Sequence, residues 1–373
     1  MCYNYSMKYF DNASTTKTSA QALKTYVEAS ELYFNPSALY ADSGKVKHLI
    51  EDARSFFVKF FGGKQGSTFI FTSCATESNN AVISSCLIRK DKKYIFSLGE
   101  HSSVYETAKH YKELGYNIVF VPLKSNGAVD ETKLLEEVDE STAFVSVIHV
   151  SNETGAINDI EAICKAVKAK NPNVLFHSDG VQAVGKVNIN LSKLSVDFYT
   201  ISAHKINGPK GIGALYIANK SKFKPLLFGG GQEMSLRSGT ENTPSILAFK
   251  TALENVKIKD YSAYKKAIVE NLSGDFVLVS DKTCVNNIIS VCFAGVRGET
   301  IAHILEEKGY LIGTGSACNS KAGNNRVLSY IVPNKYIEGA VRLSFDDSVS
   351  VEDCKLVAQE ISSACAEYIK KVR

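Results

Sequence analysis

The chain has 373 residues, of which 45% are hydrophobic and 22% are charged, and both values are ordinary for a globular protein. Its formal net charge of +4 is small beside 43 basic and 39 acidic residues, so the composition excludes an obvious nucleic-acid or membrane-surface binder. The N-terminus lacks the basic and apolar regions of a leader, and no apolar run approaches the length of a membrane span. We therefore expect a cytoplasmic protein.

The cysteine content points the same way. There are nine cysteines, an odd number, and none of them forms a Cys-X-X-Cys pair. This pattern argues against a disulfide framework or a metal site and favours a reducing compartment.

The predicted elements begin with an extended piece, Tyr9–Thr16, which is followed by helices near 20–33 and 44–61. From Thr68 to about residue 220 strands and helices alternate, and several strands are nearly continuous apolar runs, as expected when both faces of a sheet are covered. The expected strands are Thr68–Thr72, Tyr94–Ser97, Asn117–Pro122, Ala143–Val150, Val174–Ser178, Asp197–Ile201 and Gly213–Ile217. The expected connecting helices are Ala75–Arg89, Val104–Leu114, Glu131–Val138 and Ile160–Ala169.

This alternation predicts an α/β fold with a three-layer large domain and a mostly parallel seven-stranded sheet. A helix from about Thr243 leads out of it, and the remainder mixes strands and helices as in a smaller α+β C-terminal domain. We expect residues 15–250 to form the large domain, and residues 1–14 and 251–373 to form the small one.

Five short polar segments each follow a different predicted strand of the large domain. Because the carboxyl ends of parallel strands share one edge of a sheet, where ligands bind, we expect these segments to lie close together. Their central residues are Ala75, His101, Asn152, Asp179 and Lys205.

Each of these residues alone has an ordinary structural explanation. The turn at Ala75 and Thr76 could simply cap a helix, His101 could be a surface or capping histidine, and Lys205 could be a solvated loop lysine. Together, however, they offer an anion cradle, a flat stacking group, a partner for a pyridinium nitrogen and an amine that reacts with aldehydes. These are the attachments that pyridoxal 5'-phosphate needs.

Three further features lie outside the five segments. The loop Arg237–Asn242 is compact and polar and could reach a phosphate. Arg342 lies in a predicted strand, where its charge needs an anionic partner. Cys318 lies in a loop of small residues with Lys321 nearby to favour the thiolate, unlike the cysteines in apolar segments.

These motifs match a known family in order and over nearly the whole chain. The chain resembles fold-type I pyridoxal-phosphate enzymes of the class V aminotransferase group, and within it the cysteine desulfurases of the NifS/IscS type. The matching segments are Phe71–Asn80, Glu100-His101, His149–Gly155, Ser178–Gln182, Ser202–Gly211, Arg237–Asn242 and Gly315–Cys318.

The resemblance implies a role for each matching residue. Lys205 would bind the cofactor aldehyde and carry a proton, and His101 would stack on the ring and take part in proton transfer. Asp179 would hold the ring nitrogen protonated and Gln182 would bond the ring oxygen. Asn152 and Arg342 would hold the substrate carboxylate, with Asn152 also next to the cofactor. The implied phosphate ligands are Ala75, Thr76, Ser202, His204 and, from a second subunit of a homodimer, Thr240.

The resemblance also implies the reaction. Cys318 would take the sulfur of L-cysteine as a persulfide, leave L-alanine, and pass the sulfur to an acceptor protein. The segment Asn319–Arg326 lacks the Leu-Glu-Pro sequence common in housekeeping members, and the sequence ends at Arg373 without the tail of members that engage an iron–sulfur scaffold. A tRNA-thiolation or cofactor-sulfur protein is therefore also open as acceptor. A selenocysteine lyase, another class V enzyme and a catalytically idle sulfur-relay homologue are the alternatives.

Overall fold

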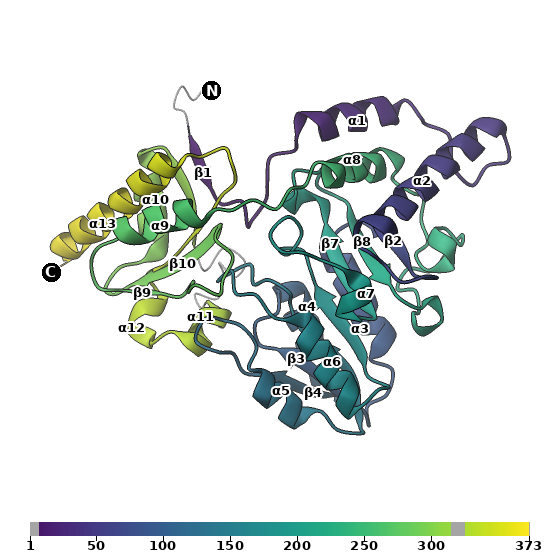
Figure 1. Ribbon diagram of the computed structural model, residues 1–373, viewed down its shortest axis with the longest axis horizontal. Helices are drawn as coiled ribbons and strands as arrows, with labels where there is room; N and C mark the ends of the chain where they lie inside the picture. The colour runs from purple at the N-terminus through teal and green to yellow at the C-terminus, as the bar shows by residue number, and fades with distance from the viewer. Residues whose placement is uncertain (1–6, 315–324, 373) are drawn as a thin grey trace.

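A seven-stranded sheet forms the centre of the larger part of the molecule, with the strand order β2-β8-β7-β6-β5-β3-β4 (Figure 1). The computed structural model describes residues 7–314 and 325–372 of the chain. The strands are β2 (Thr68–Thr72), β3 (Lys93–Ser97), β4 (Asn117–Val121), β5 (Thr142–Ser146), β6 (Leu175–Asp179), β7 (Phe198–Ser202) and β8 (Gly213–Ile217). This sheet and its order confirm the predicted fold class.

Only β8 runs against its neighbours: it pairs antiparallel with both β2 and β7, whereas the other pairs are parallel. Every residue of β2, β7 and β8 is buried, as the continuous apolar runs in the sequence predict for strands covered on both faces. The carboxyl ends of β2, β3, β5, β6 and β7 therefore share one edge of the sheet.

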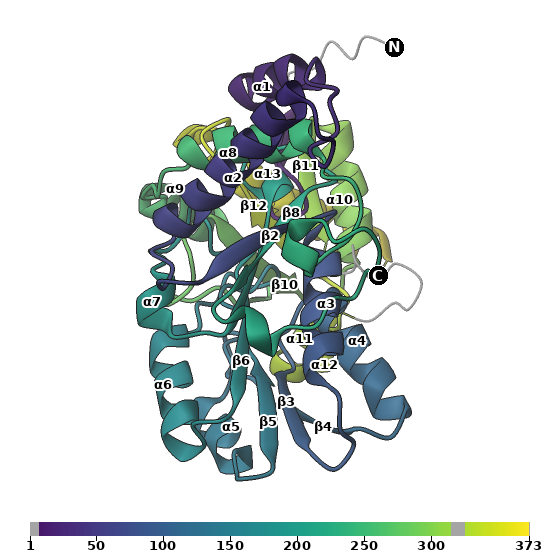
Figure 2. The ribbon, with the colours of Figure 1, turned by 90° about the vertical axis from the view of Figure 1, so that its right-hand side faces the viewer.

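Helices cover both faces of this sheet and give it three layers. Figure 2 shows α6 and α7 on one side of the sheet and α3 and α4 on the other. The hydrophobic core on the side of α6 also contains side chains of α2 and α8. The helices are α1 (Ala20–Ser30), α2 (Ala41–Phe60), α3 (Ala75–Cys86), α4 (Ser102–Glu113), α5 (Glu131–Glu137), α6 (Ile160–Lys170), α7 (Leu191–Leu194) and α8 (Thr243–Glu254).

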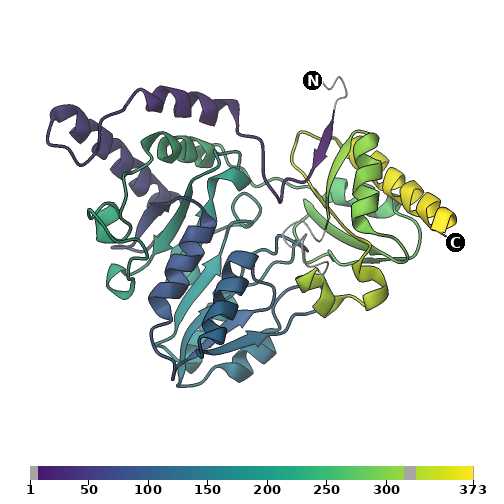
Figure 3. The same ribbon diagram turned by 180° about the vertical axis from the view of Figure 1, so that it is seen from behind.

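A second, five-stranded sheet has the order β1-β11-β12-β10-β9 and packs against α9, α10 and α13, as Figure 3 shows from behind. Its strands are β1 (Lys8–Phe10), β9 (Phe276–Leu278), β10 (Ile288–Phe293), β11 (Tyr310–Thr314) and β12 (Ala340–Ser344). The helices of this part are α9 (Ser262–Asn271), α10 (Gly298–Glu307), α11 (Arg326–Ile331), α12 (Asn334–Ile337) and α13 (Val351–Val372).

The N-terminal segment connects the two sheets. β1 pairs parallel with β11, so the chain begins in the smaller sheet. It then crosses to the larger one, where the Thr16 amide donates to the His204 carbonyl at 2.9 Å and the Ser19 amide donates to Asn207 O at 2.9 Å. Residues 11–16 therefore pass directly beside the end of β7, where Lys205 lies.

No helix in residues 7–314 or 325–372 has both the length and the apolar character needed to cross a bilayer.

Candidate active site

Lys205 lies directly after β7, in a short 3-10 turn that spans Ala203–Lys205. Its side chain is half-buried, and its Nζ donates to Ala13 O at 2.6 Å and to Ser14 O at 2.5 Å. The N-terminal segment thus holds the amine at the carboxyl edge of the large sheet, among groups that the sequence places far away.

The same segment contacts two more of the residues predicted from sequence, and one of them in turn contacts a third. Gln182 Nε2 donates to Ala13 O at 2.9 Å, and Arg342 Nη2 donates to Ser14 Oγ at 2.7 Å. Arg342 Nη1 also donates to Asn152 O at 2.8 Å. A contact between Arg342 Nη2 and the carboxylate of Asp11, 2.7 Å long, balances the charge of the buried guanidinium.

Asp179 and His101 belong to one chain of hydrogen bonds. Asp179 ends β6 with only 3% of its surface exposed, and it accepts from Asn79 Nδ2 at 2.8 Å and from the Val181 amide at 3.0 Å. Asn79 Nδ2 also donates to Ser103 Oγ at 2.8 Å, and Ser103 Oγ lies 2.9 Å from His101 Nδ1. The carboxylate and the imidazole are therefore oriented by shared partners.

His101 also caps α4, because its Nδ1 accepts from the Ser103 amide at 3.2 Å. With Nδ1 as acceptor, the proton of the neutral ring lies on Nε2. Burial lowers the pKa of His101, and the cations Lys205 and Arg326 lower it further, whereas Asp179 opposes them. The ring is therefore neutral at pH 7, with Nε2 as its hydrogen-bond donor.

The first residues of α3, Ala75 and Thr76, follow the edge strand β2 and lie beside the start of β8. Gly213 begins β8 opposite Ser202 at the end of β7. A Cβ on Gly213 would lie 2.7 Å from Cys74 C and 2.9 Å from Ala75 N. Glycine thus lets the start of α3 approach Ser202, and the exposed amides at a helix N-terminus favour an anion.

His204 is the other predicted phosphate ligand on this edge. Its Nδ1 lies 3.1 Å from Thr15 Oγ1. Burial, followed by the nearby Lys205 ammonium, lowers the pKa of His204 to about 4, so it acts at neutral pH as an uncharged hydrogen-bonding group.

The buried polar atoms that have no hydrogen-bond partner within the described residues include Gln182 Oε1, Ser202 Oγ and Arg342 Nε at this site. Buried polar atoms are normally paired, so these three indicate a bound molecule with several polar groups. Their positions beside an amine and a helix N-terminus fit pyridoxal phosphate and an amino-acid carboxylate. No cluster of three or more His, Cys, Asp or Glu side chains in the described parts of the chain could bind a metal ion.

Two predicted residues do not join this group. Thr240 is exposed and lines a cavity of about 120 Å³ together with Thr72, Ser73 and Arg237. Cys318 lies outside the described residues, so its place relative to Lys205 stays a prediction.

The sequence analysis missed Asn79, Ser103 and the segment Asp11–Ser14, all of which orient predicted site residues. Asn79 lies within a motif that was recognised, but its direction toward Asp179 depends on the helix rotation. It also missed Gly180, where a Cβ would lie 2.0 Å from the Tyr199 ring. The Asp-Gly sequence was the available signal for that close contact.

The comparisons with known proteins agree over most of the chain. Residues 8–357 match the class V aminotransferase family. The chain is 36% identical to cysteine desulfurase 2 of Trichormus variabilis over 91% of this chain and 88% of the relative, and 36% identical to a NifS/IcsS protein homolog of Lactobacillus delbrueckii subsp. bulgaricus over 93% and 94%.

Solved structures give the same result. A NifS-like protein matches with a TM-score of 0.88 at 30% identity, covering 97% of this chain and 100% of that one. SspA in complex with cysteine matches with a TM-score of 0.81 at 28% identity, covering 91% and 98%. The sequence match, the fold and the ordered motifs lead to one conclusion: the chain belongs to the class V aminotransferase family and is one of its NifS/IscS-type members.

Proposed function

We propose that this chain is a pyridoxal-phosphate-dependent cysteine desulfurase, which converts L-cysteine to L-alanine and captures the sulfur as a persulfide on Cys318. The observation that carries the proposal is the convergence of Lys205, Gln182 and Arg342 on the segment Asp11–Ser14, at the edge where Asp179 and His101 also lie. The curated relatives named cysteine desulfurase support the same activity.

The proposed cofactor contacts follow from the chemistry of each group. Pyridoxal phosphate, when bound, withdraws electrons from the Cα of an amino acid, so that groups on Cα and Cβ become labile. Asp179 is buried at the end of β6, where its carboxylate would face a ring nitrogen and keep it protonated. His101 supplies a flat neutral ring for stacking, and the unpaired Gln182 Oε1 marks the side chain that meets the ring oxygen. The proposed phosphate ligands are Ala75, Thr76, Ser202, His204 and Thr240.

Substrate binding and proton transfer involve different side chains. Arg342 is 6% exposed, and the free hydrogen-bonding capacity of its Nε suits a carboxylate. Asn152 lies next to it through the 2.8 Å contact of its carbonyl with Arg342 Nη1. Lys205 would hold the cofactor and then move a proton at the substrate Cα, and His101 would take part in that proton transfer.

Cys318 breaks the bond that defines the reaction. Its thiolate attacks the substrate sulfur, a new S–S bond forms, and the Cβ–S bond breaks. The electron pair of that bond remains on Cβ, which takes a proton and becomes the methyl group of alanine. The products are a Cys318 persulfide and L-alanine, so the step needs no external oxidant or reductant, and the persulfide passes its outer sulfur to an acceptor protein.

We infer a homodimer in which Thr240 serves the second copy. Thr240 is exposed on the loop that follows the glycines 229–231. The same loop region exposes the apolar side chains of Leu227 (39%), Phe228 (84%) and Met234 (41%). Exposed apolar side chains grouped in this way favour a protein interface, and a second copy that received Thr240 would cover them.

The experiment that tests the proposal is incubation of the purified protein and of Lys205→Ala with L-cysteine, L-selenocysteine and a panel of amino acids. Sulfide, selenide and alanine are measured together with the visible absorbance of the cofactor. With a thiol reductant present to release the persulfide sulfur as sulfide, we expect alanine and sulfide in equal amounts from L-cysteine, and neither the products nor the absorbance of lysine-bound cofactor in Lys205→Ala. Selenide without sulfide would support a selenocysteine lyase, and absorbance without any product would support the idle homologue.

A further inference from the structure

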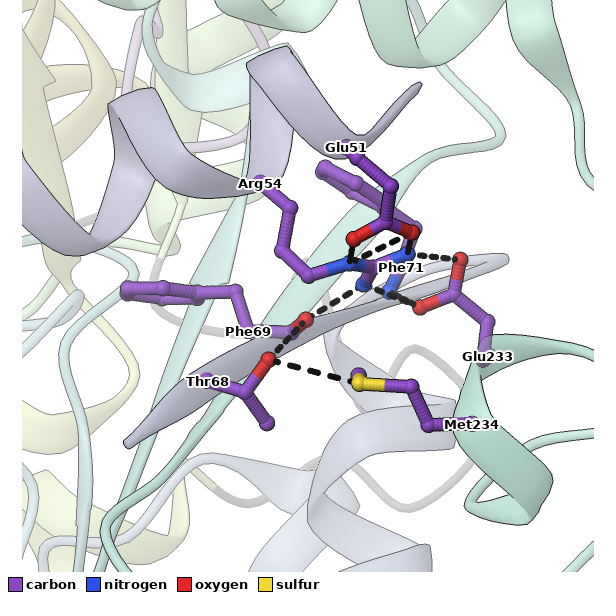
Figure 4. Close-up of polar contacts among 7 residues, drawn as sticks. All are labelled: Glu51, Arg54, Thr68, Phe69, Phe71, Glu233 and Met234. Carbon is purple, nitrogen blue, oxygen red and sulfur yellow. Dashed lines mark hydrogen bonds and ion pairs between the residues drawn. The ribbon is translucent and has the colours of Figure 1, made fainter. Parts of the chain in front are cut away.

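A buried ion pair fixes the loop that carries Thr240. Arg54 of α2 donates to both carboxylate oxygens of Glu233, at 2.6 Å and 3.1 Å (Figure 4). Arg54 is 5% exposed and Glu233 is 4% exposed. Arg54 also donates to Glu51 at 3.1 Å, whereas the ion pair of Glu233 is made with Arg54. Because a buried charge is costly without its partner, Glu233 requires Arg54.

The pair also binds the free edge of the sheet. β2 is an edge strand, so part of its backbone has no neighbouring strand to bond. The Phe71 amide donates to Glu233 Oε2 at 3.0 Å, and Arg54 Nη1 donates to Phe69 O at 2.5 Å. These contacts attach the loop to β2, the strand that leads into the start of α3.

The backbone at Glu233 would not hold its conformation unaided. Glu233, Met234 and Ser235 have φ angles of 49°, 60° and 62°, which form a left-handed turn of three consecutive residues other than glycine. Residues other than glycine rarely adopt this conformation, because the Cβ then lies too close to the backbone. The contacts of the Glu233 carboxylate with Arg54 and β2 stabilise it.

Contacts within the loop connect this turn to Thr240. Gln232 Oε1 accepts from the Gly239 amide at 3.0 Å, which fixes the residue directly before Thr240. Arg237 Nε donates to Glu77 of α3 at 2.9 Å, which makes a second attachment. The position of Thr240 thus depends on the turn at Glu233.

We propose that Glu233, held by Arg54, is a positioning residue that fixes the loop 229–242 so that Thr240 meets the cofactor phosphate of a second copy of the chain. This inference rests on the proposed function, in which Thr240 acts across the dimer. In this proposal Glu233 acts through Gln232, Gly239 and Thr240, and its effect therefore appears in the partner's site.

The test uses two mixed dimers made by co-expression with different affinity tags. In the first, one copy carries Glu233→Gln and the other carries Lys205→Ala, so the site with a lysine faces an unaltered loop. In the second, one copy is unaltered and the other carries both substitutions, so the site with a lysine faces the altered loop. The absorbance of lysine-bound cofactor is titrated in each and reports only on the site that keeps Lys205.

We expect the second dimer to bind pyridoxal phosphate roughly tenfold more weakly than the first, because a displaced ligand loses its favourable geometry. Equal affinities would overturn the proposal. The two dimers contain the same substitutions, so a general loss of stability cannot produce the difference. If the unaltered protein takes up no cofactor, the proposed function fails instead.

A matched control is Asp197→Asn. The Asp197 carboxylate likewise accepts from a strand amide, Phe176 N at 2.9 Å, and pairs with Lys168 at 2.8 Å, but it lies at the opposite edge of the sheet. The Asp197→Asn substitution, placed in the two mixed dimers instead of Glu233→Gln, should leave the affinity for pyridoxal phosphate unchanged in both. If Glu233→Gln does not fold, Glu233→Asp keeps the charge but shortens the reach to Arg54, and the same difference between the two mixed dimers is expected.

Discussion

His101 shows that a structural and a functional explanation of one residue need not exclude each other. Its Nδ1 caps α4, as an ordinary capping histidine would, and the same nitrogen connects it through Ser103 and Asn79 to Asp179. The sequence could suggest each role separately. The chain of hydrogen bonds that combines them depends on side-chain directions, which spacing alone does not determine.

Glu100, next to His101, is buried with 1% of its surface exposed, and it accepts from Ser146 Oγ at 2.9 Å. Burial first, and then the nearby Asp179 charge, raise the pKa of Glu100 to about 8. The folded protein therefore binds this proton more tightly than the unfolded chain does. The stability that follows is fully present below the ordinary pKa of 4.5 and is lost as the pH rises toward 8.

We therefore predict that Glu100→Gln stabilises the cofactor-free protein relative to the unaltered one by a few kcal/mol more at about pH 8.5 than at about pH 5.5. Urea unfolding of both proteins at the two pH values measures the difference. Glu136→Gln, at an exposed position of α5, is the control and should show no such dependence. If the difference in unfolding free energy between Glu100→Gln and the unaltered protein is the same at both pH values, the Glu100 carboxyl is not buried in its protonated form.

At the scale of elements, the sequence predicted the strands of the large sheet within a few residues. It predicted this part well because buried parallel strands are uniformly apolar and are separated by amphipathic helices. The elements of the smaller part were predicted less completely, because neither α9 nor β11 was expected from the sequence. β11 pairs with β1 at the other end of the chain, and such a pairing over some 300 residues has no local signal.

Gly213 sets the distance between β8 and the start of α3, so a change at this residue tests how the two elements pack. A Cβ there would lie 2.7 Å and 2.9 Å from backbone atoms of Cys74 and Ala75, so α3 would have to move. We predict that Gly213→Ala costs about 1–3 kcal/mol of stability and weakens pyridoxal phosphate binding roughly tenfold or more.

The matched control for that change is Gly44→Ala. Gly44 lies in α2, and a Cβ there would meet nothing within 4 Å. Alanine should stabilise this helix by up to about 1 kcal/mol without changing cofactor affinity. Thermal unfolding and cofactor titration of both variants make the comparison, and unchanged affinity in Gly213→Ala would refute the proposed anion site at α3.

For the whole molecule, the sequence could predict which strand ends carry the candidate site, since parallel strands share an edge. It could not predict that the segment Asp11–Ser14 crosses from the smaller sheet to hold Lys205, Gln182 and Arg342. That crossing depends on the pairing of β1 with β11, and Arg342 itself lies on β12 beside β11. The site is thus built by both sheets, and the chemistry further requires Cys318.

The most direct measurement of the central claim is a single-turnover reaction of the cofactor-loaded protein with one equivalent of L-cysteine, followed by mass spectrometry. We predict one alanine per subunit and one added sulfur atom, located on the peptide that contains Cys318. Cys318→Ala should keep the cofactor absorbance and form neither product. Cys365→Ala should react normally, because burial raises the pKa of the Cys365 thiol to about 12 and keeps it unreactive. Full alanine formation by Cys318→Ala, or a persulfide on another cysteine, would contradict the account.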